Sequence, residues 1–253
     1  MKKRFWVLKG KKLFWIFLIV SILTICIEHY PVVETVASKR LLPIYSVACE
    51  DMRVALTFDC AWGAEDIPQI MDTLNQNDLQ ACFFTVGTWV DKNPEAVKLL
   101  SENGMEIGNH SNSHAHVGKM GYEANIKDMK QCNEKIESIT GEKVRFYRGA
   151  YGEYSNEVIQ AAASLGMQVI QWDIDTLDYE GKTPDEMCKR IQKKIRNGNI
   201  ILMHNDTKYT AQGLQQIIDT IKEMGYEIVP LSELVYQDNY EINHEGRQFL
   251  TPV

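Results

Sequence analysis

The stretch Val54-Ala-Leu-Thr-Phe-Asp59 is an apolar run of strand length that ends in an acid. An unbroken apolar run of this length is typical of a strand that is buried on both faces, as in a parallel sheet covered by helices. Six further runs of this kind follow along the chain: Ala81–Gly87, Met105–His110, Arg145–Ala150, Gln168–Asp175, Asn199–Asn205 and Glu227–Leu231. We therefore expect about seven parallel strands.

Helix signals lie between these runs. Asn93-Pro94 is a typical helix start, and Thr183-Pro184-Asp185-Glu186 has the pattern of a capping box. Helical spacing continues from Tyr122 to Thr140 and stops at Gly141. The alternation predicts an α/β fold, a distorted (β/α) barrel, with a doubly wound open sheet as the alternative. No G-x-G-x-x-G follows the first strand, which argues against a dinucleotide site.

The length and charge of the chain limit the possible functions. Its 253 residues carry a net charge of −7, with 45% hydrophobic and 24% charged residues, close to a globular average. Residues 1–12 hold six Lys or Arg side chains and no acid, which leaves 21 basic against 34 acidic residues, a net charge of −13, in the remainder. A protein with this acidic net charge is unsuited to binding nucleic acid, because phosphate binding depends on cationic side chains. Six cysteines are too few for a disulfide scaffold.

The basic segment 1–12 is followed by fifteen uncharged residues, 13–27. As a helix they would extend about 22 Å, short of the roughly 30 Å hydrocarbon core unless flanking lysines snorkel. We expect a signal anchor that leaves residues 1–12 in the cytoplasm and the rest outside the cytoplasmic membrane, and a cleaved signal peptide is the alternative. Residues 28–50 are then a linker, 51–236 the exported folded domain and 237–253 a C-terminal tail.

Polar residues cluster where the predicted strands end, and the carboxyl ends of a parallel barrel are where active sites are built. These residues are Asp59 and Cys60, His110 and His114, Arg148 and Tyr151, Asp173, Asp175 and Asp178, and His204. If the strands are as predicted, these side chains converge on one rim. Taken alone, Asp59 is also a typical helix N-cap and His204 a typical hydrogen-bonded structural residue. Together, Asp59 could act as a general base and His204, beside Asp178 or Asp175, as a general acid.

The pair His110-Ser-Asn-Ser-His114 has the spacing of two histidines that share a metal ion. A polar loop that happens to be rich in histidine is the other interpretation. A metal site needs a further ligand and an open position for water. Cys60, Asp59 and Asp66 are the candidates for that ligand.

The motifs T-F-D, H-x3-H, R-x-x-Y, D-x-x-D and L-x-H occur here in that order between about Val54 and Leu234. In this order they resemble the NodB-type polysaccharide deacetylases, carbohydrate esterase family 4. The resemblance implies a distorted barrel of parallel strands. It also implies metal-dependent hydrolysis of N-acetyl groups on amino-sugar glycans such as peptidoglycan or chitin.

The resemblance also implies roles for individual residues. Asp59 would be the base, oriented by Arg148, and His110 and His114 would bind the metal. The backbone N–H of Tyr151 would stabilise the oxyanion and Leu202 would line the acetyl pocket. His204, tuned by Asp178, would protonate the leaving amine. Trp62, after the first strand, is a loop-packing residue or a surface on which sugar stacks.

Three positions depart from the family pattern. The usual R-P-P-Y is Arg148-Gly149-Ala150-Tyr151 here, and the usual D-x-x-D-W is Asp175-Thr-Leu-Asp-Tyr179. The usual second Asp after T-F-D, the third metal ligand of the family, is Cys60. As a thiolate Cys60 would favour zinc in a Cys-His-His site with one open position, whereas a thiol facing away would leave two histidines and water.

We therefore expect a monomeric, membrane-tethered deacetylase that uses a divalent metal, with zinc favoured, and acts on an acetylated amino-sugar glycan. A catalytically silent domain that keeps a glycan-binding cleft is one alternative, because the usual metal Asp is absent. An O-acetyl esterase with the same mechanism is the other.

Overall fold

The computed structural model describes residues 10, 14–15, 17–21 and 40–251. The chain divides into two units, residues 1–39 and 40–253. In the first unit residues 14–15 and 17–21 are helical. No helix among the described residues is long and apolar enough to cross a membrane. The other residues of the predicted 13–27 anchor, most of segment 1–12 and residues 28–39 of the predicted linker lie outside the described residues.

The second unit is an α/β fold built on a curled, mostly parallel sheet, so the predicted fold class is confirmed. All seven predicted runs contain strands: β2 (Arg53–Cys60), β3 (Cys82–Thr85), β4 (Glu106–Asn109), β5 (Phe146–Tyr147), β6 (Gln168–Val169) with β7 (Ile174–Asp175), β8 (Asn199–His204) and β9 (Glu227–Ile228). The pairs β8–β2, β2–β3, β3–β4, β4–β5 and β5–β6 are all parallel.

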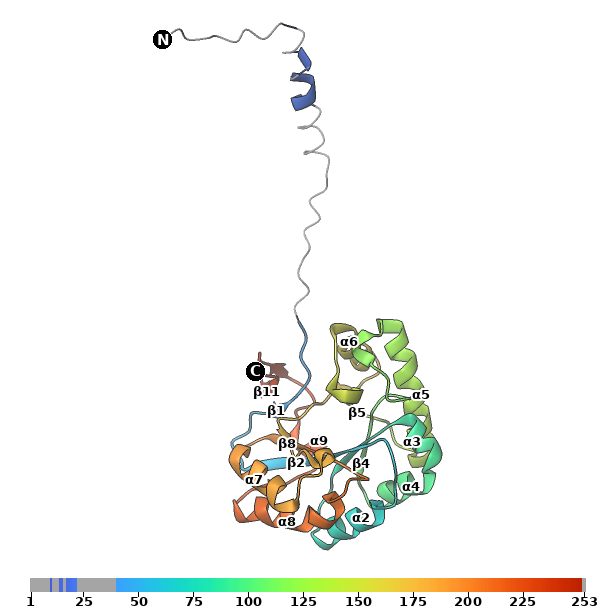
Figure 1. Cartoon of the computed structure of the whole chain (residues 1–253), viewed down its shortest axis with the longest axis vertical. Coiled ribbons are helices and arrows are strands. Elements are labelled where there is room, and N and C mark those ends of the chain that lie inside the picture. Colours follow the sequence, from blue (N-terminus) through green and yellow to red (C-terminus); the bar gives the residue numbers. More distant parts are fainter. Residues whose placement is uncertain (1–9, 11–13, 16, 22–39, 252–253) are drawn as a thin grey trace, which may run out of the picture. The chain divides into compact units, whose positions relative to one another are not determined.

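Helices surround the strands of this unit (Figure 1). They are α2 (Ile67–Gln76), α3 (Gly87–Lys92), α4 (Pro94–Glu102), α5 (Tyr122–Thr140), α6 (Asn156–Ser164), α7 (Pro184–Lys194), α8 (Thr210–Glu223) and α9 (Leu231–Leu234). The predicted helix starts and stops are largely confirmed. Pro94 opens α4, Gly141 ends α5 in a left-handed conformation, and the capping box of Thr183 and Glu186 opens α7.

The predicted strand 168–175 is two short strands, and each has a different neighbour. β6 pairs with β5, whereas β7 pairs with β8 through Ile174–Ile201 and Asp175–Leu202. The segment 168–175 thus connects the two ends of the parallel run β8-β2-β3-β4-β5-β6. This curl distinguishes the fold from the open doubly wound alternative.

Residues 40–50, which the sequence analysis assigned to a linker, belong to the folded unit. Ile44 bridges Ile170, and β1 (Ser46–Val47) pairs with β8 at Ser46–Asn199. The assigned tail also adds strands, because β11 (Arg247–Leu250) pairs with β1 and β10 (Tyr240–Ile242) pairs with β11. The interruption between β6 and β7 leaves backbone groups that need partners. Ile44 supplies them, since its N–H donates to Val169 and its carbonyl accepts from Gln171.

Two apolar layers pack against opposite faces of the sheet. Val54, Leu56, Phe58 and Cys60 of β2 belong to the layer shared with the helices. The residue between the first two, Ala55, faces the interior of the curl together with other small and aromatic side chains: Cys82, Phe84, Phe146, Ile170 and Ile200. Because strand side chains alternate between faces, Asp59 lies on the interior side and Cys60 on the helix side.

We predict that Ile44→Ala destabilises the full chain by about 2–5 kcal/mol, because Ile44 is 1% exposed and completes the interior layer where the sheet curls shut. Urea unfolding followed by circular dichroism measures the change. Leu250→Ala is the control, since Leu250 is 57% exposed and we expect a change within about 0.5 kcal/mol. Equal effects of the two substitutions would contradict a closing role for residues 40–47.

Candidate active site

A cavity of about 300 Å³ opens at the carboxyl ends of the parallel strands. Seven of the predicted site residues line it: Asp59, Trp62, His110, His114, Tyr151, Leu202 and His204. The rest of its wall is formed by Ala61, Gly152, Trp172, Asp175 and Tyr179. The structure therefore brings most of the predicted rim together. Arg148 and Asp178 lie behind this wall, where each contacts a residue of the cavity.

Asp59 is the second-last residue of β2 and is 5% exposed. Nη1 of the buried Arg148 donates to its Oδ1 at 2.7 Å. Burial acts to raise the pKa of Asp59, but the positive charge of Arg148, with smaller contributions from His110 and His204, outweighs it and lowers that pKa. Asp59 is therefore an ionised carboxylate in an almost dry position.

His110 and His114 lie beside Asp59, with their ring centres 5.2 Å apart. Nδ1 of His110 is 2.9 Å from the carbonyl of Arg148, and its Nε2 is 3.4 Å from Oδ2 of Asp59. Burial lowers the pKa of His110 and lowers that of His114 to about 4. Both rings are thus neutral at pH 7, and Nδ1 of His110 donates to the carbonyl and leaves a lone pair on Nε2.

His204 ends β8, the strand next to β2. Its Nδ1 donates to Oδ1 of Asp178 at 2.9 Å, and its backbone N–H donates to Oδ2 at 2.6 Å. Thr210 also donates to Oδ2 of Asp178, which fixes this buried carboxylate. Burial acts to lower the pKa of His204, but its hydrogen bond to Asp178 and the nearby acids outweigh burial and raise that pKa. His204 therefore holds a proton more strongly than a free imidazole.

Cys60 does not join the two histidines. It has no exposed surface and packs in the apolar layer between sheet and helices, because it follows Asp59 in the strand and points to the opposite face. Burial raises the pKa of Cys60 well above its usual value, so its sulfur is a protonated thiol. A thiol is a poor metal ligand, since the thiolate is the form that binds. The geometry thus disagrees with the predicted Cys-His-His set.

Asp66 does not replace Cys60. Its Oδ2 accepts the backbone N–H of Asp206 at 2.9 Å, next to the start of α2, and it is absent from the cavity wall. Asp173 is also elsewhere, because it accepts from the backbone N–H of Ile200 at 3.1 Å and contacts Arg196. Of the acids predicted around strand 168–175, only Asp175 lines the cavity directly.

The donor chemistry of the two histidines fits a divalent metal, since both are neutral and Nε2 of His110 faces the cavity side of Asp59. Within the described part of the chain, however, no group of three or more His, Cys, Asp or Glu residues is arranged to hold a metal ion. The residues therefore fit two protein ligands, with water left to fill the other positions.

Sequence reasoning missed part of the cavity wall. Trp172, inside the predicted strand 168–175, is half-buried and lines the cavity as well as contacting the interior layer. The alternation of Trp172 with Asp173 along the segment is the signal that could have placed it. Together with Trp62, Tyr151 and Tyr179, which are 58%, 61% and 52% exposed, it gives the mouth of the cavity an aromatic rim.

Tyr151 is held by a contact that the sequence did not indicate. Its φ is 59°, a left-handed conformation that is uncommon for a tyrosine. The ring of His116 stacks on the ring of Tyr151 at 4.6 Å, and Nδ1 of His116 contacts Glu153 at 2.8 Å. The neighbouring positions 149 and 150 are Gly and Ala, so this stack supports a loop that contains no proline.

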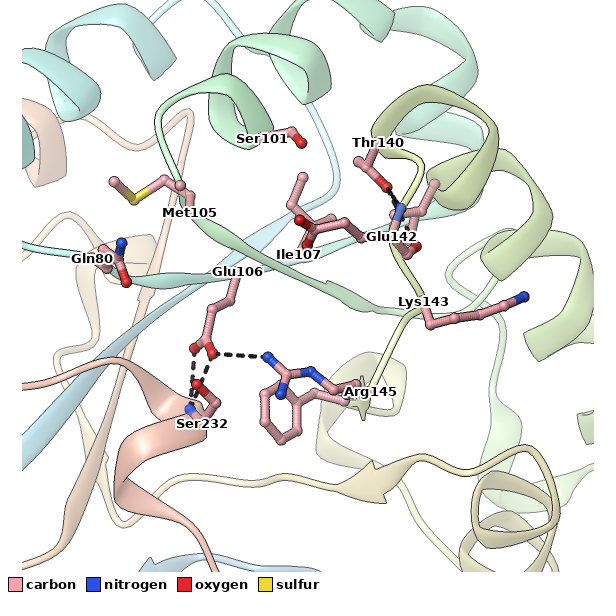
Figure 2. Close-up of a pocket in the computed structure, with 13 residues that line it drawn as sticks. Gln80, Ser101, Met105, Glu106, Ile107, Thr140, Glu142, Lys143, Arg145 and Ser232 are labelled. Carbon is pink, nitrogen blue, oxygen red and sulfur yellow. Dashed lines mark hydrogen bonds and ion pairs between the residues drawn. The ribbon is translucent and has the colours of Figure 1, made fainter. Parts of the chain in front are cut away.

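A different hollow, of about 210 Å³, lies at the amino ends of β3, β4 and β5, at the other end of the sheet (Figure 2). Glu106 accepts the backbone N–H of Ser232 at 3.1 Å and contacts Arg145 at 3.7 Å there. None of the predicted site residues lines it. In parallel barrels this end contributes stability, and the catalytic end is the other one.

Comparison with known proteins agrees with this geometry. A family model described as polysaccharide deacetylase matches residues 47–170. A peptidoglycan-N-acetylglucosamine deacetylase of Bacillus cereus is 30% identical over 187 residues, which cover 72% of this chain and 87% of that protein. The chain belongs to the polysaccharide deacetylase family. The candidate active site therefore lies in a member of this family, at the carboxyl ends of its parallel strands.

In two further relatives, the match to this chain covers only part of the relative's length. The uncharacterized protein YlxY of Bacillus subtilis is 33% identical over 193 residues, which cover 76% of this chain and 60% of YlxY. The peptidoglycan-N-acetylglucosamine deacetylase PgdA of Listeria monocytogenes is 30% identical over 212 residues, 84% of this chain and 44% of PgdA. The chain thus spans about half the length of these two relatives.

Among solved structures, a CE4 family pseudoenzyme from Bacillus anthracis superposes with a TM-score of 0.74 at 33% identity, covering 77% of this chain and 69% of that one. A mutant of the same protein with restored enzymatic activity gives the same TM-score at 34% identity, covering 77% and 71%. Similarity of this kind is therefore compatible with both an active and an inactive site.

We predict that Asp178→Asn lowers the pKa of His204, because burial is then opposed only by the more distant charges of Asp59 and Asp175. Because the folded pKa of His204 is raised in the native chain, its contribution to stability is complete below pH 6.5 and is lost as the pH rises through the folded pKa. An NMR titration of the His204 ring measures the shift. Glu180→Gln, at an exposed acid of the same turn, is the control. An unchanged His204 pKa in Asp178→Asn would rule out this pairing.

Proposed function

We propose that this chain is a hydrolase that removes N-acetyl groups from an amino-sugar polysaccharide of the peptidoglycan type. The observation that carries the proposal is that Asp59 and His204 are register partners on the neighbouring strands β2 and β8. Neighbouring strands lie about 4.8 Å apart, so an ionised carboxylate and a histidine with a raised pKa face one cavity side by side.

Amide hydrolysis needs a base that activates the attacking water. Asp59 is suited to this because Arg148 holds one of its oxygens, and the other, Oδ2, is on the side of the two histidines. The charge of Arg148 keeps the carboxylate ionised, and burial leaves it little contact with bulk water. Asp59 would take the proton of the water as it attacks the acetyl carbon.

The reaction also needs a proton for the leaving amine, which is a poor leaving group without one. His204 holds a proton on the ring whose Nδ1 is bound to Asp178, so its Nε2 is free to donate. The backbone N–H of Tyr151, whose residue lines the cavity, would donate to the developing oxyanion. Leu202, 2% exposed, would pack on the acetyl methyl group.

His110 and His114 would hold a divalent metal, and zinc suits their imidazole nitrogens. When bound, such a metal would polarise the acetyl oxygen and lower the pKa of water. The remaining chemistry rests on Asp59 and His204.

The substrate class follows from the walls of the cavity and from the relatives. Trp62, Tyr151 and Tyr179 offer flat, exposed rings at the mouth, and such rings stack on the apolar faces of sugars. The B. cereus and L. monocytogenes relatives are named as peptidoglycan-N-acetylglucosamine deacetylases. An acetylated amino-sugar glycan fits both observations.

We further propose that the chain acts as a monomer outside the cytoplasmic membrane. The basic segment 1–12 and the uncharged segment 13–27 would tether it there, with a cleaved signal peptide as the alternative. The second unit would then meet its glycan on the outer side.

The second candidate function is a catalytically silent glycan-binding domain. It is favoured by the place of Cys60 on the helix side of β2, which leaves two histidines as the protein ligands in the cavity. The similarity to a CE4 family pseudoenzyme supports the same idea. An O-acetyl esterase would use the same residues, since an ester differs from the amide in its leaving group.

We predict that Asp59→Asn lowers acetate release from acetylated peptidoglycan fragments at least about 100-fold, because the amide cannot take a proton. In the native chain, activity requires Asp59 without a proton and His204 with one. Since the pKa of Asp59 is lowered and that of His204 is raised, the pH profile should fall below the Asp59 pKa and above the His204 pKa. Acetate is measured enzymatically between pH 4 and 9.

Asp72→Asn, at an exposed acid on α2, is the control and should retain activity. Circular dichroism checks that Asp59→Asn remains folded beside Arg148. Undiminished acetate release by folded Asp59→Asn would exclude Asp59 as the base. Absence of acetate from the native chain with Zn²⁺, Mn²⁺ or Co²⁺, together with retained glycan binding, would favour the silent domain.

We predict that the full chain binds about one Zn²⁺ and that His110→Ala weakens this binding at least tenfold, because one of two imidazole ligands is lost. Isothermal titration calorimetry with Zn²⁺ measures both. His244→Ala, outside the cavity, is the control. Zinc affinity that is equal in His110→Ala and the native chain would place the metal elsewhere.

A further inference from the structure

A second hollow, of about 350 Å³, adjoins the candidate active site. Its wall is made by Arg40, Gly118, Lys119, Gly152, Glu153 and Tyr154. Gly152 also lines the active-site cavity, so the two spaces meet across its backbone. A side chain at Gly152 would contact Trp172, since a Cβ there would lie 2.9 Å from the indole. The absence of a side chain therefore lets the Trp172 ring pack against the Gly152 backbone between the two spaces.

Arg40 and Lys119 make this hollow basic, although residues 13–253 carry a net charge of −13. Nη2 of Arg40 donates to the hydroxyl of Tyr154 at 2.8 Å, and its guanidinium carbon is 5.6 Å from the centre of that ring. Among the residues that the structure describes, neither Arg40 nor Lys119 takes part in an ion pair. A guanidinium has five N–H donors, so most of those of Arg40 are left for a ligand.

Glu153 is the one acid of the wall, and donors within the loop occupy both its oxygens. Nδ1 of His116 lies 2.8 Å from Oε1, and the N–H of Gly118 donates to Oε2 at 3.2 Å. The two cations thus outnumber this carboxylate, which is already bonded. The side-chain groups of the hollow that remain available to a ligand are therefore the N–H donors of Arg40 and Lys119.

Arg40 is held in place both through the backbone of the next residue and through its own guanidinium group. The backbone N–H of Leu41 donates to Oδ1 of Asn156 at the start of α6, at 2.8 Å. Tyr154, which holds the guanidinium, also packs edge-on against Tyr45 at 6.5 Å. The head of Arg40 is therefore placed before a ligand arrives, which reduces the entropy lost on binding.

We infer that this hollow binds a carboxylate carried by the sugar next to the one whose acetyl group enters the active-site cavity. The inference rests on the proposed function and makes its substrate an anionic glycan. Arg pairs with carboxylates through parallel N–H donors, and Lys119 adds a second positive charge. A glycan whose sugars bear free carboxylates is anionic, whereas chitin is uncharged, so Arg40 and Lys119 select between the two.

The experiment compares two substrates that differ only in charge: a peptidoglycan-type oligosaccharide with free sugar carboxylates, and the same oligosaccharide with these carboxylates amidated. With the full chain we expect kcat/KM to be roughly 5- to 10-fold higher for the charged form at low ionic strength, mainly through KM. This preference should shrink at 0.5 M NaCl, because salt screens exposed charges. The double variant Arg40→Gln, Lys119→Gln should lose the preference.

Arg40→Lys, which keeps the charge, should retain most of the preference, and Lys98→Gln on α4 should retain all of it. A double variant that still prefers the charged substrate to the native extent overturns the inference. Calorimetric binding of both oligosaccharides to the same variants separates this result from a failure of the proposed function. If no substrate releases acetate but the charged one binds more tightly through Arg40 and Lys119, the subsite stands and the hydrolase does not. If acetate is released without any preference for charge, the hydrolase stands and the subsite does not.

Discussion

The ion pair between Arg148 and Asp59 is the contact on which the site and the fold around it both depend. Arg148 has no exposed surface, so its charge must be compensated within the protein. One nitrogen donates to Asp59, and the others donate to the carbonyls of Ile170 and Gln171. Those carbonyls lie in the segment that pairs with both β5 and β8. The same guanidinium thus keeps Asp59 ionised and ties the sheet at the place where it curls shut.

Asp59 and His204, the two charged groups of the cavity, are each paired with a buried residue behind the cavity wall. Arg148 lowers the pKa of Asp59, and Asp178 raises that of His204. Because these partners are buried and hydrogen-bonded, the charges are in place before any substrate binds, and little reorganisation is needed. The two reacting groups then need only be neighbours, which the parallel register of β2 and β8 ensures.

The same strand geometry explains the difference between Asp59 and Cys60. The two are adjacent in sequence, and the motif placed both in the site. In a regular strand, adjacent side chains point to opposite faces. Because Asp59 of β2 points into the cavity, Cys60 must point away from it. The sequence analysis left the thiol either in the metal site or facing away. The structure has it facing the helices, and the candidate metal site accordingly has two protein ligands among the described residues.

Much of this molecule could be predicted from the sequence because its signals are local. Unbroken apolar runs indicated the strands, and Pro94, Gly141 and the Thr183 capping box indicated helix ends, since each acts on the backbone beside it. The order of the motifs indicated the family and the residues of the rim. Other features depend on contacts between distant segments. Ile44 joins the sheet because β6 and β7 leave backbone groups to pair, His116 stacks on Tyr151 across a loop, and Arg40 reaches Tyr154 over 114 positions. The sequence by itself determined the element types and the chemistry available at the strand ends. The tertiary structure decided which face each side chain takes and which partner sets its charge, because burial and pKa depend on neighbours that only folding brings together.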